Sequence, residues 1–442
     1  MSDPARSLHL SARVPSRGAL IYAMVLMALI QVVNYMDRLI IAGLVDPIKR
    51  DLGLSDTEIG LLTGLVFSLF YASAGIPLAR LADKTSRRSI ITWSMVVWGT
   101  MTAVGAAAQN FLQLALARVG VAIGEAGCVP AAHAMISDLF PPQKRASAIA
   151  LFSAGAPIGV FLALALGGWV AQAYGWRATL FFAGAASLAV AALVALTLRE
   201  PPRGAADGVH VVPDQSSFLE AAKRLLLIPS YRHLLVALAL GVFTSYGISN
   251  WLPSYFIRSF GVTQAQAGII VGSAAGLAMA AGMVVGGFIG DWLARRGLRW
   301  LLWQSVFTNL VTVPIYATAF LAKTPEVAGL MTFLASFVGA VGQGPAMASV
   351  QNSVPPSLRA TAASFLLFST AIVGLGAGSL AIGMLSDALT PMYGKDALRY
   401  SLLLAIPVVL WVAVHTWLAS RTIERDAMLA TKNPGDIQRE GT

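Results

Sequence analysis

Residues 79–88 read ARLADKTSRR and residues 287–296 read GFIGDWLARR, so an aspartate and two arginines recur at an offset of 208 residues. Residues 141–148 (PPQKRASA) return in the same way as residues 355–362 (PPSLRATA), at an offset of 214 residues. Two motifs that repeat in the same order and at nearly the same offset indicate an internal duplication. The sequence therefore predicts two related halves.

The regions around these motifs are strongly apolar. The chain is 57% hydrophobic and 12% charged, whereas soluble domains have about 25% charged residues, and its mean hydropathy is +0.71. A helix needs about 20 apolar residues to cross a bilayer. We therefore expect an all-α membrane protein with 12 transmembrane helices in two six-helix halves. The expected spans are residues 19–45, 57–81, 89–109, 111–137, 145–171, 177–198, 232–257, 264–293, 299–321, 326–351, 359–386 and 397–419.

The placement of the basic residues predicts the orientation. If both termini are cytoplasmic, the cytoplasmic segments hold 22 of the 31 Lys and Arg residues. This bias follows the positive-inside rule, so we expect a multi-pass protein of the inner (cytoplasmic) membrane with both termini inside. The bias also explains the net charge of +10 without a nucleic-acid partner. Residues 1–18 are polar and indicate no cleavable signal peptide.

These spans divide the chain into five segments. We expect a cytoplasmic N-terminal tail (1–18), a first half (19–198), a cytoplasmic linker (199–231), a second half (232–419) and a cytoplasmic C-terminal tail (420–442). Within the linker, residues 218–227 (FLEAAKRLLL) are amphipathic, which is typical of a short helix on the membrane surface.

Four charged residues lie inside apolar spans of the first half. Arg118 and Glu125 are seven positions apart, just under two helical turns, so their side chains share one helix face. Asp37 and Arg38 lie in the first span. Each such group costs roughly 2.5–3.5 kcal/mol at the centre of a membrane, so we expect them to pair or to line a wet cavity. This pattern is typical of a transporter.

The depth of these residues suggests how they pair. Asp37 and Arg118 lie at a similar distance from the outer ends of their spans, so we expect Arg118 to be the partner of Asp37, with Arg38 directed elsewhere. Proton coupling is assigned to Glu125 and Asp37, because a buried carboxyl group beside an arginine can be poised to exchange a proton. Protonation of Glu125 would leave a net positive charge near Arg118, which would couple a proton to an anionic headgroup. The alternative is that the four groups only hold the first half together.

Several motifs resemble those of a known family. Residues 34–38 (NYMDR) precede Ala-Gly at 42–43, and residues 118–126 read RVGVAIGEA. Together with DLF at 138–140, REPPRG at 199–204 and the 12 spans, they resemble the spinster branch of the major facilitator superfamily. Its animal members move sphingosine-1-phosphate and lysophospholipids. The first copy of the repeated element departs from the usual family pattern, since Ala79 and Ser86 stand where glycines are common.

The resemblance implies a cytoplasmic gate, and the residue pattern of the second half suggests a substrate pocket. In the family, the repeated acidic element bridges to a neighbouring helix and holds the cytoplasmic side closed, and a charge pair that forms in one state biases a two-state equilibrium. The gate residues would be Asp83, Arg87, Arg88, Asp291, Arg295 and Arg296. The second half has no charged residue deep in a span. An aromatic stripe at helical spacing more often packs against neighbouring helices than lines a pocket. Pocket residues would be Tyr35, Phe243, Tyr246, Asn250 and Gln343, with a headgroup at Arg118 and Arg38 and a tail along Phe243 and Tyr246.

Other functional classes find little support. The one cysteine, Cys128, and five scattered histidines form no nucleophile–base pair or metal motif, so we expect no enzyme. No nucleotide-binding Gly-x4-Gly-Lys-Ser/Thr loop occurs, so a proton gradient is the expected energy source and no cofactor is expected. A channel is disfavoured by the duplicated gate elements. We expect a monomeric, proton-coupled transporter of an amphipathic lipid. The alternatives are a proton-coupled importer of small organic anions such as sugar acids, and a sensor that binds lipid without moving it.

Overall fold

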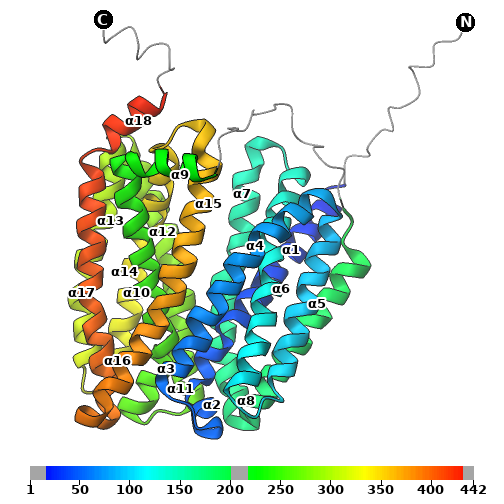
Figure 1. The fold of residues 1–442 in the computed structure, drawn as a ribbon, viewed down its shortest axis with the longest axis vertical. Coiled ribbons are helices and arrows are strands. Elements are labelled where there is room, and N and C mark those ends of the chain that lie inside the picture. Colours follow the sequence, from blue (N-terminus) through cyan, green and yellow to red (C-terminus); the bar gives the residue numbers. More distant parts are fainter. Residues whose placement is uncertain (1–15, 201–217, 432–442) are drawn as a thin grey trace, which may run out of the picture.

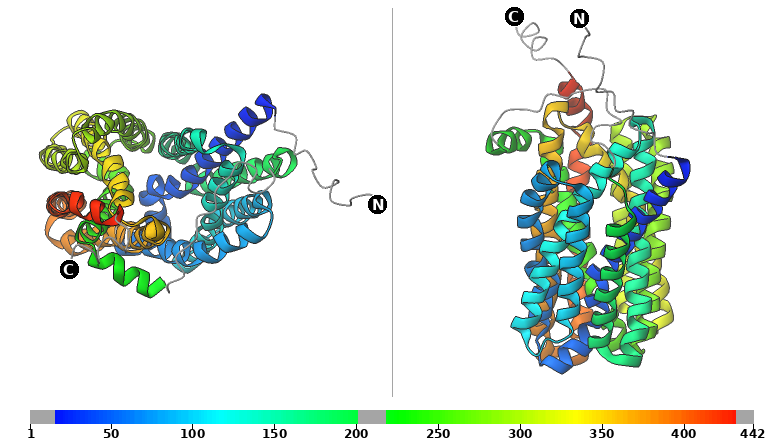
Figure 2. Two further views of the ribbon diagram at one scale, coloured as in Figure 1. Left: turned by 90° about the horizontal axis from the view of Figure 1, so that it is seen from above. Right: turned by 90° about the vertical axis from the view of Figure 1, so that its right-hand side faces the viewer.

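The computed structural model describes residues 16–200 and 218–431, which form helices joined by short loops. Most of the expected N-terminal tail, linker residues 201–217 and residues 432–442 lie outside the described residues. The helices form two bundles that stand side by side (Figure 1), and the view along the bundles separates them clearly (Figure 2). We call the side on which the described chain begins and ends the terminal side, and the opposite side the distal side.

The first bundle contains six crossings. Gly175 has a φ of 84° inside the long helix α8 and divides it into two crossings. The helices are α1 (Arg17–Ile40), α2 (Val45–Leu52), α3 (Asp56–Gly60), α4 (Val66–Lys84), α5 (Arg87–Gly105), α6 (Phe111–Leu139), α7 (Pro142–Ser153) and α8 (Gly155–Thr197).

The second bundle repeats this plan. Its helices are α10 (Pro229–Phe260), α11 (Gln264–Gly272), α12 (Met279–Ala294), α13 (Leu298–Leu321), α14 (Pro325–Asn352), α15 (Arg359–Ser369), α16 (Ala377–Tyr393) and α17 (Ala397–Ser420). In the described chain, eight helical stretches are long and apolar enough to cross a membrane. Two of these stretches, Gln143–Thr197 and Thr361–Ser420, each contain two crossings, which gives ten crossings. Helices α5 and α13 are the remaining two of the 12.

The duplication is visible in local structure as well as in sequence. The first crossing ends at Gly53 and the seventh at Gly261, and both glycines have a left-handed φ near 66°. Each is followed by a capping box, Ser55 with Glu58 in one half and Thr263 with Gln266 in the other. Both pairs of residues keep the offset of 208. The first crossing therefore corresponds to the seventh, residue by residue, at this turn.

The two halves share a core on the distal side. Glycines allow close approach there: a Cβ added at Gly60 would lie 2.8 Å from the carbonyl oxygen of Ser379, and one added at Gly276 would lie 2.7 Å from that of Pro157. One buried cluster contains residues of both halves, including Leu164 and Trp251. Toward the terminal side, the buried residues form one cluster in each half.

Two short helices lie on the terminal side of the second half. Helix α9 (Phe218–Leu227) occupies the linker segment for which the sequence predicts a helix, and it buries Leu225. Helix α18 (Ile423–Thr431) lies within the expected C-terminal tail, where the sequence predicts no element. Ile423 is fully buried, and Oδ2 of Asp426 accepts a hydrogen bond from the backbone N–H of Ser230 at 2.9 Å. Thus α18 caps the first turn of α10.

Candidate functional site

The charged residues of the first half gather between α1, α5 and α6. Nε and Nη2 of Arg38 both donate to Oε2 of Glu125, at 2.8 and 2.6 Å. Glu125 is fully buried, and the Arg38 side chain is 10% exposed. The pair therefore joins the first and fourth crossings deep inside the first half.

Asp37 and Arg118 are not paired as expected. The fully buried Asp37 accepts a hydrogen bond from Thr102 at 2.8 Å through Oδ2. Within the described chain, Oδ1 of Asp37 and Nε of Arg118 are buried without a hydrogen-bond partner. The expectation rested on depth along the helices, and depth does not fix the rotation of each helix. Arg38 forms the direct ion pair, whereas Arg118 lies near Asp37 without one.

Aromatic rings contact the guanidinium groups of both Arg38 and Arg118. The Cζ atom of Arg38 lies 4.8 Å from the ring centre of Tyr71, 5.1 Å from that of Tyr35 and 5.4 Å from that of Phe67. The Cζ atom of Arg118 lies 4.9 Å from the same Phe67 ring. Ring faces attract cations, and more strongly away from water. Phe67 and Tyr71 were not predicted as site residues, although their i, i+4 spacing on α4 was an available signal.

Unpaired polar atoms surround this cluster. Nε1 of Trp98 is buried without a hydrogen-bond partner among the described residues, and the Asn34 amide lies beside the Glu125 carboxylate without a hydrogen bond of ordinary geometry. Most buried polar groups in proteins are paired, and exceptions call for an explanation. A site that exchanges protons or accepts a polar ligand provides one.

The predicted pocket residues of the second half lie in two places. Tyr246 of α10 lies beside Tyr35 of the first half, while Asn250 is buried. Gln343 lines a separate cavity of about 150 Å³ inside the second half. Phe243, Tyr246 and Asn250 do not line this cavity, because they lie on the opposite face of α10.

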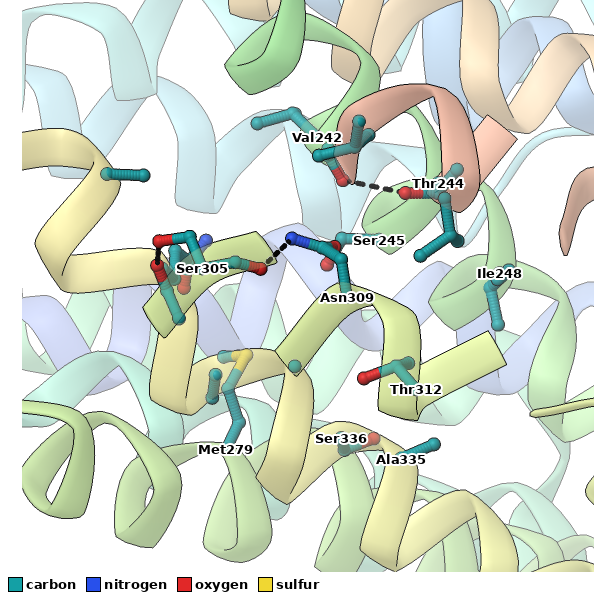
Figure 3. Close-up of a pocket in the computed structure, with 18 of the residues that line it drawn as sticks. Val242, Thr244, Ser245, Ile248, Met279, Ser305, Asn309, Thr312, Ala335 and Ser336 are labelled. Carbon is teal, nitrogen blue, oxygen red and sulfur yellow. Dashed lines mark hydrogen bonds between the residues drawn. The ribbon is translucent and has the colours of Figure 1, made fainter. Parts of the chain in front are cut away.

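Hydroxyl and amide side chains line part of this cavity (Figure 3), while the larger share of its surface is apolar. Asn309 donates to the carbonyl oxygen of Ser305 at 2.7 Å, and Ser305 donates to that of Gly342 at 2.5 Å. The other lining residues are mostly small or aliphatic. The polar side chains that line it are Thr244, Ser245, Ser249, Ser305, Asn309, Thr312, Tyr316, Ser336, Gln343 and Thr416.

The contacts that the structure describes for the predicted gate residues lie within one half. Arg87 forms an ion pair with Asp138, and Arg88 donates to the carbonyl oxygen of Leu198 at 3.3 Å, all within the first half. In the second half, Asp291 and the two arginines are exposed, and the guanidinium of Arg296 stacks on Trp292 with Cζ 4.1 Å from the ring centre. The side chain of Asp83 lies outside the described atoms, so the gate stays a prediction.

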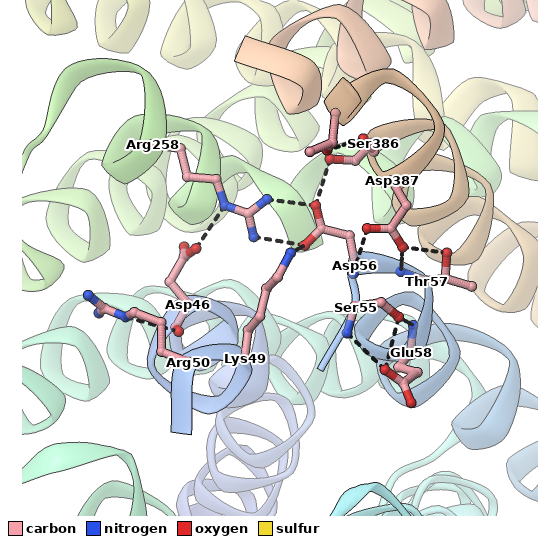
Figure 4. Close-up of polar contacts among 11 residues, drawn as sticks. Asp46, Lys49, Arg50, Ser55, Asp56, Thr57, Glu58, Arg258, Ser386 and Asp387 are labelled. Carbon is pink, nitrogen blue, oxygen red and sulfur yellow. Dashed lines mark hydrogen bonds and ion pairs between the residues drawn. The ribbon is translucent and has the colours of Figure 1, made fainter. Parts of the chain in front are cut away.

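A charge network that the sequence analysis missed joins the halves on the distal side (Figure 4). Arg258 at the end of α10 donates to Asp46 at 2.8 Å and to both carboxylate oxygens of Asp56 at 2.7 and 3.0 Å. Asp56 also accepts from Lys49 at 2.5 Å and from Ser386 of α16 at 2.6 Å.

A second carboxylate completes this distal network. Asp387 of α16 accepts hydrogen bonds from the backbone N–H groups of Asp56 and Thr57, at 3.1 and 2.7 Å, and from the Thr57 hydroxyl at 2.7 Å. It thereby caps α3 of the opposite half, where an anion also complements the helix dipole. We call Asp46, Lys49, Asp56, Thr57, Arg258, Ser386 and Asp387 the distal latch.

Comparison with known proteins places this architecture in a family. Residues 27–379 match the Major Facilitator Superfamily. The chain is 37% identical over 401 residues to an "MFS-type efflux pump" of Mycolicibacterium smegmatis, covering 90% of this chain and 92% of the relative. It is 30% identical over 288 residues to a "Probable L-galactonate transporter" of Escherichia coli K12, covering 62% of each.

A solved structure agrees over nearly the whole chain. It is the crystal structure of a bacterial homolog to the human lysosomal transporter spinster, in an inward-facing and unoccupied conformation. The TM-score is 0.84 with 30% sequence identity, and the match covers 93% of this chain and 99% of that one. These matches confirm the expected fold class of 12 transmembrane helices in two halves. The chain belongs to the major facilitator superfamily and is a spinster-like, multi-pass membrane transporter.

Proposed function

We propose that the protein is a proton-coupled secondary transporter of an organic anion that works by alternating access. The observation that carries the proposal is the buried ion pair of Arg38 and Glu125 beside Asp37 and Arg118. A membrane protein needs no such group for stability alone, because buried charges are costly and apolar replacements are often as stable. The proton gradient would be the energy source, with no other cofactor and with a monomer as the working unit.

The geometry supports a specific coupling step. The two Arg38 donors converge on Oε2 of Glu125, so a proton on this carboxyl group would weaken both contacts. With Asp37 and Glu125 ionised, the four charges sum to zero. Protonation of Glu125 leaves a net charge of about +1 and frees the Arg38 guanidinium, which with Arg118 can bind an anionic group. Asp37 would serve as a second proton site.

The distal latch provides the second element of alternating access. If both termini are cytoplasmic, as the positive-inside rule predicts, the latch closes the outer side, and this structure is inward-facing. Charge-assisted hydrogen bonds contribute about 1.5–3 kcal/mol each, and opening the outer side would break those of Arg258. The predicted terminal-side gate, with Asp83 and Asp291, would form in the opposite state.

Two substrate classes are favoured by separate observations. The similarity to a "Sphingosine-1-phosphate transporter SPNS2" of Danio rerio, 24% identical over 398 residues, and the aromatic rings around Arg38 favour an amphipathic lipid anion such as a lysophospholipid. The hydroxyl-lined cavity and the E. coli relative favour a small hydroxylated acid. A sensor that binds lipid without moving it would show saturable binding but no flux.

The test is uptake by purified protein in vesicles with an imposed pH gradient, against labelled lysolipids of increasing chain length and small organic anions. Proton-driven accumulation of at least one anion, abolished by a protonophore, is expected. Each buried methylene contributes up to about 0.8 kcal/mol, so a lipid substrate gives an affinity that rises with chain length and a small acid gives no such series. Binding without accumulation for every compound would contradict the transport proposal.

A further inference from the structure

The second-half cavity lies where internal symmetry places the charged cluster of the first half. The offset of 208 residues holds from Gly53 and Gly261 to the repeated aspartates, so Ser245 corresponds to Asp37. Ser245 lines the cavity. The first crossing thus carries a buried carboxylate at the position where the seventh carries a hydroxyl.

The fourth and tenth crossings give the same correspondence independently. Asn110 caps α6 by accepting from the N–H three residues on, and Thr324 caps α14 in the same way. Their offset of 214 residues is also that of the repeated Pro-Pro motifs. At this offset Gly339 corresponds to Glu125, and Gly339 also lines the cavity. Replacement of a buried glutamate by glycine explains why the second half is hollow at this position.

The chemistry of the lining identifies what fits the cavity. The polar residues that α13 contributes fall on one face, at i, i+4, i+7 and i+11 from Ser305 to Tyr316. Ser245 and Gln343 form no hydrogen bond with another described residue. The lining is uncharged, so it can pair with hydroxyl groups, but it offers no counter-charge to a buried ion. Its volume of about 150 Å³ is enough for several water-sized groups.

One helix connects this cavity with the charged cluster. Ser245 of α10 lines the cavity, while its neighbour Tyr246 lies beside Tyr35 of the first half. Tyr35 in turn packs against the Arg38 guanidinium. The two sites therefore lie on either side of α10. One substrate could contact both sites at once or occupy them in succession.

We propose that this cavity is a second substrate subsite, which binds the uncharged, hydroxyl-bearing part of the transported anion. The proposal rests on the proposed function and deepens it. The first half then supplies charge recognition and proton exchange, and the second half supplies recognition of hydroxyl groups.

Two glycine variants of the same helix test the subsite. A methyl group at Gly339 has only Oγ1 of Thr312 within 4 Å, at 3.8 Å, and therefore enters the cavity without a clash. A methyl group at Gly344 meets nothing within 4 Å, and Gly344 does not line the cavity. Alanine favours the helix at both positions, so both variants should fold, and Gly344→Ala is the matched control.

The probes are gluconate and hexanoate, two six-carbon carboxylates that differ in their hydroxyl groups, measured by equilibrium binding to the purified full-length protein. We expect the unmodified protein to prefer gluconate by about tenfold or more. Gly339→Ala should reduce this preference by about tenfold, Ser245→Ala by about fivefold, and Gly344→Ala should leave it unchanged.

Three results would overturn the subsite: hexanoate bound as tightly as gluconate, equal effects of the two glycine variants, or no effect of Gly339→Ala. Any of these could occur while proton-driven uptake of an anion persists in vesicles, and the proposed function would then stand without the subsite. Loss of proton-driven uptake for every anion contradicts the proposed function itself.

Discussion

The charged cluster of the first half and the cavity of the second half occupy corresponding positions but differ in chemistry. Asp37 and Glu125 are fully buried where the second half has Ser245 and Gly339. The backbone register has survived the duplication, as the paired turns and caps show, while the side chains have diverged. The comparison teaches that one half of the protein can carry the ionisable groups while the other offers a neutral hydrogen-bonding surface.

Loss of the proton site should have the largest effect on transport. Glu125→Gln keeps the shape and one hydrogen-bond acceptor for Arg38 but cannot exchange a proton. We expect proton-driven accumulation in vesicles to be abolished, while folding and some substrate binding persist. Glu326→Gln, an exposed acid in the first turn of α14, is the control and should transport normally. Undiminished proton-driven flux in Glu125→Gln would remove this residue from the coupling mechanism.

Loss of the unpaired arginine should have the next largest effect. Arg118→Ala removes a buried guanidinium that stacks on Phe67 and that we assign to the substrate anion. The affinity should fall by about 30-fold, equivalent to about 2 kcal/mol, part of which reflects the loss of a positive charge near Asp37. Binding assays on Arg421→Ala provide the control, because Arg421 is an exposed arginine that also stacks on a ring, that of Trp417. Equal affinities in the two variants would argue that Arg118 is structural.

The distal latch gives a third, intermediate effect. Arg258→Gln removes the ion pairs to Asp46 and Asp56, and the population open on the distal side should rise about tenfold or more. A cysteine at Ser379, buried where the halves meet, reports this opening in a Cys128→Ser background. Arg50→Gln is the matched control, because within the described chain the hydrogen bond of Arg50 is to the backbone of its own helix, at Asp46. Labelling that stays unchanged in Arg258→Gln would show that the latch does not hold the closed state.

The predicted terminal-side gate should give the smallest effect. Asp83→Asn and Asp291→Asn should each weaken a partly exposed charge network by about 1 kcal/mol, or about fivefold in population. The shift should favour the state open on the terminal side, so labelling of the Ser379 cysteine should decrease. If labelling is the same in both variants as in the parent, the repeated elements act only as signals of topology.

Much of the fold could be predicted from the sequence, because repeated motifs and long apolar runs are local patterns. The shared face of Arg118 and Glu125 followed from helical periodicity. The pairing of Arg38 with Glu125 did not, since it depends on how the first and fourth crossings rotate. Helix α18 was missed because its docking on Ser230 is a tertiary contact.

The distal latch and the cavity were missed for different reasons. The latch joins Asp56 to Arg258 and Asp387, which are far apart in the sequence. In the sequence, Arg258 is only one of the few basic residues on the outer side of the positive-inside pattern. Most residues that line the cavity are Ser, Thr, Gly or Ala. These residues are common in membrane helices, where hydroxyls bond to the preceding turn, so they gave no signal, whereas the amide of Gln343 did.

The measurement that tests the division of labour most directly is the pH dependence of anion binding in three proteins: the unmodified chain, Glu125→Gln and Gly339→Ala. The probe is the anion that the vesicle assay identifies. In the unmodified chain, affinity should increase as the pH falls, because protonation of Glu125 releases Arg38 for the anion. Glu125→Gln should bind with a strongly reduced pH dependence, the remainder coming from Asp37, while Gly339→Ala should bind more weakly with the dependence of the unmodified chain. An undiminished pH dependence in Glu125→Gln, or its loss in Gly339→Ala, would contradict this division of roles between the halves.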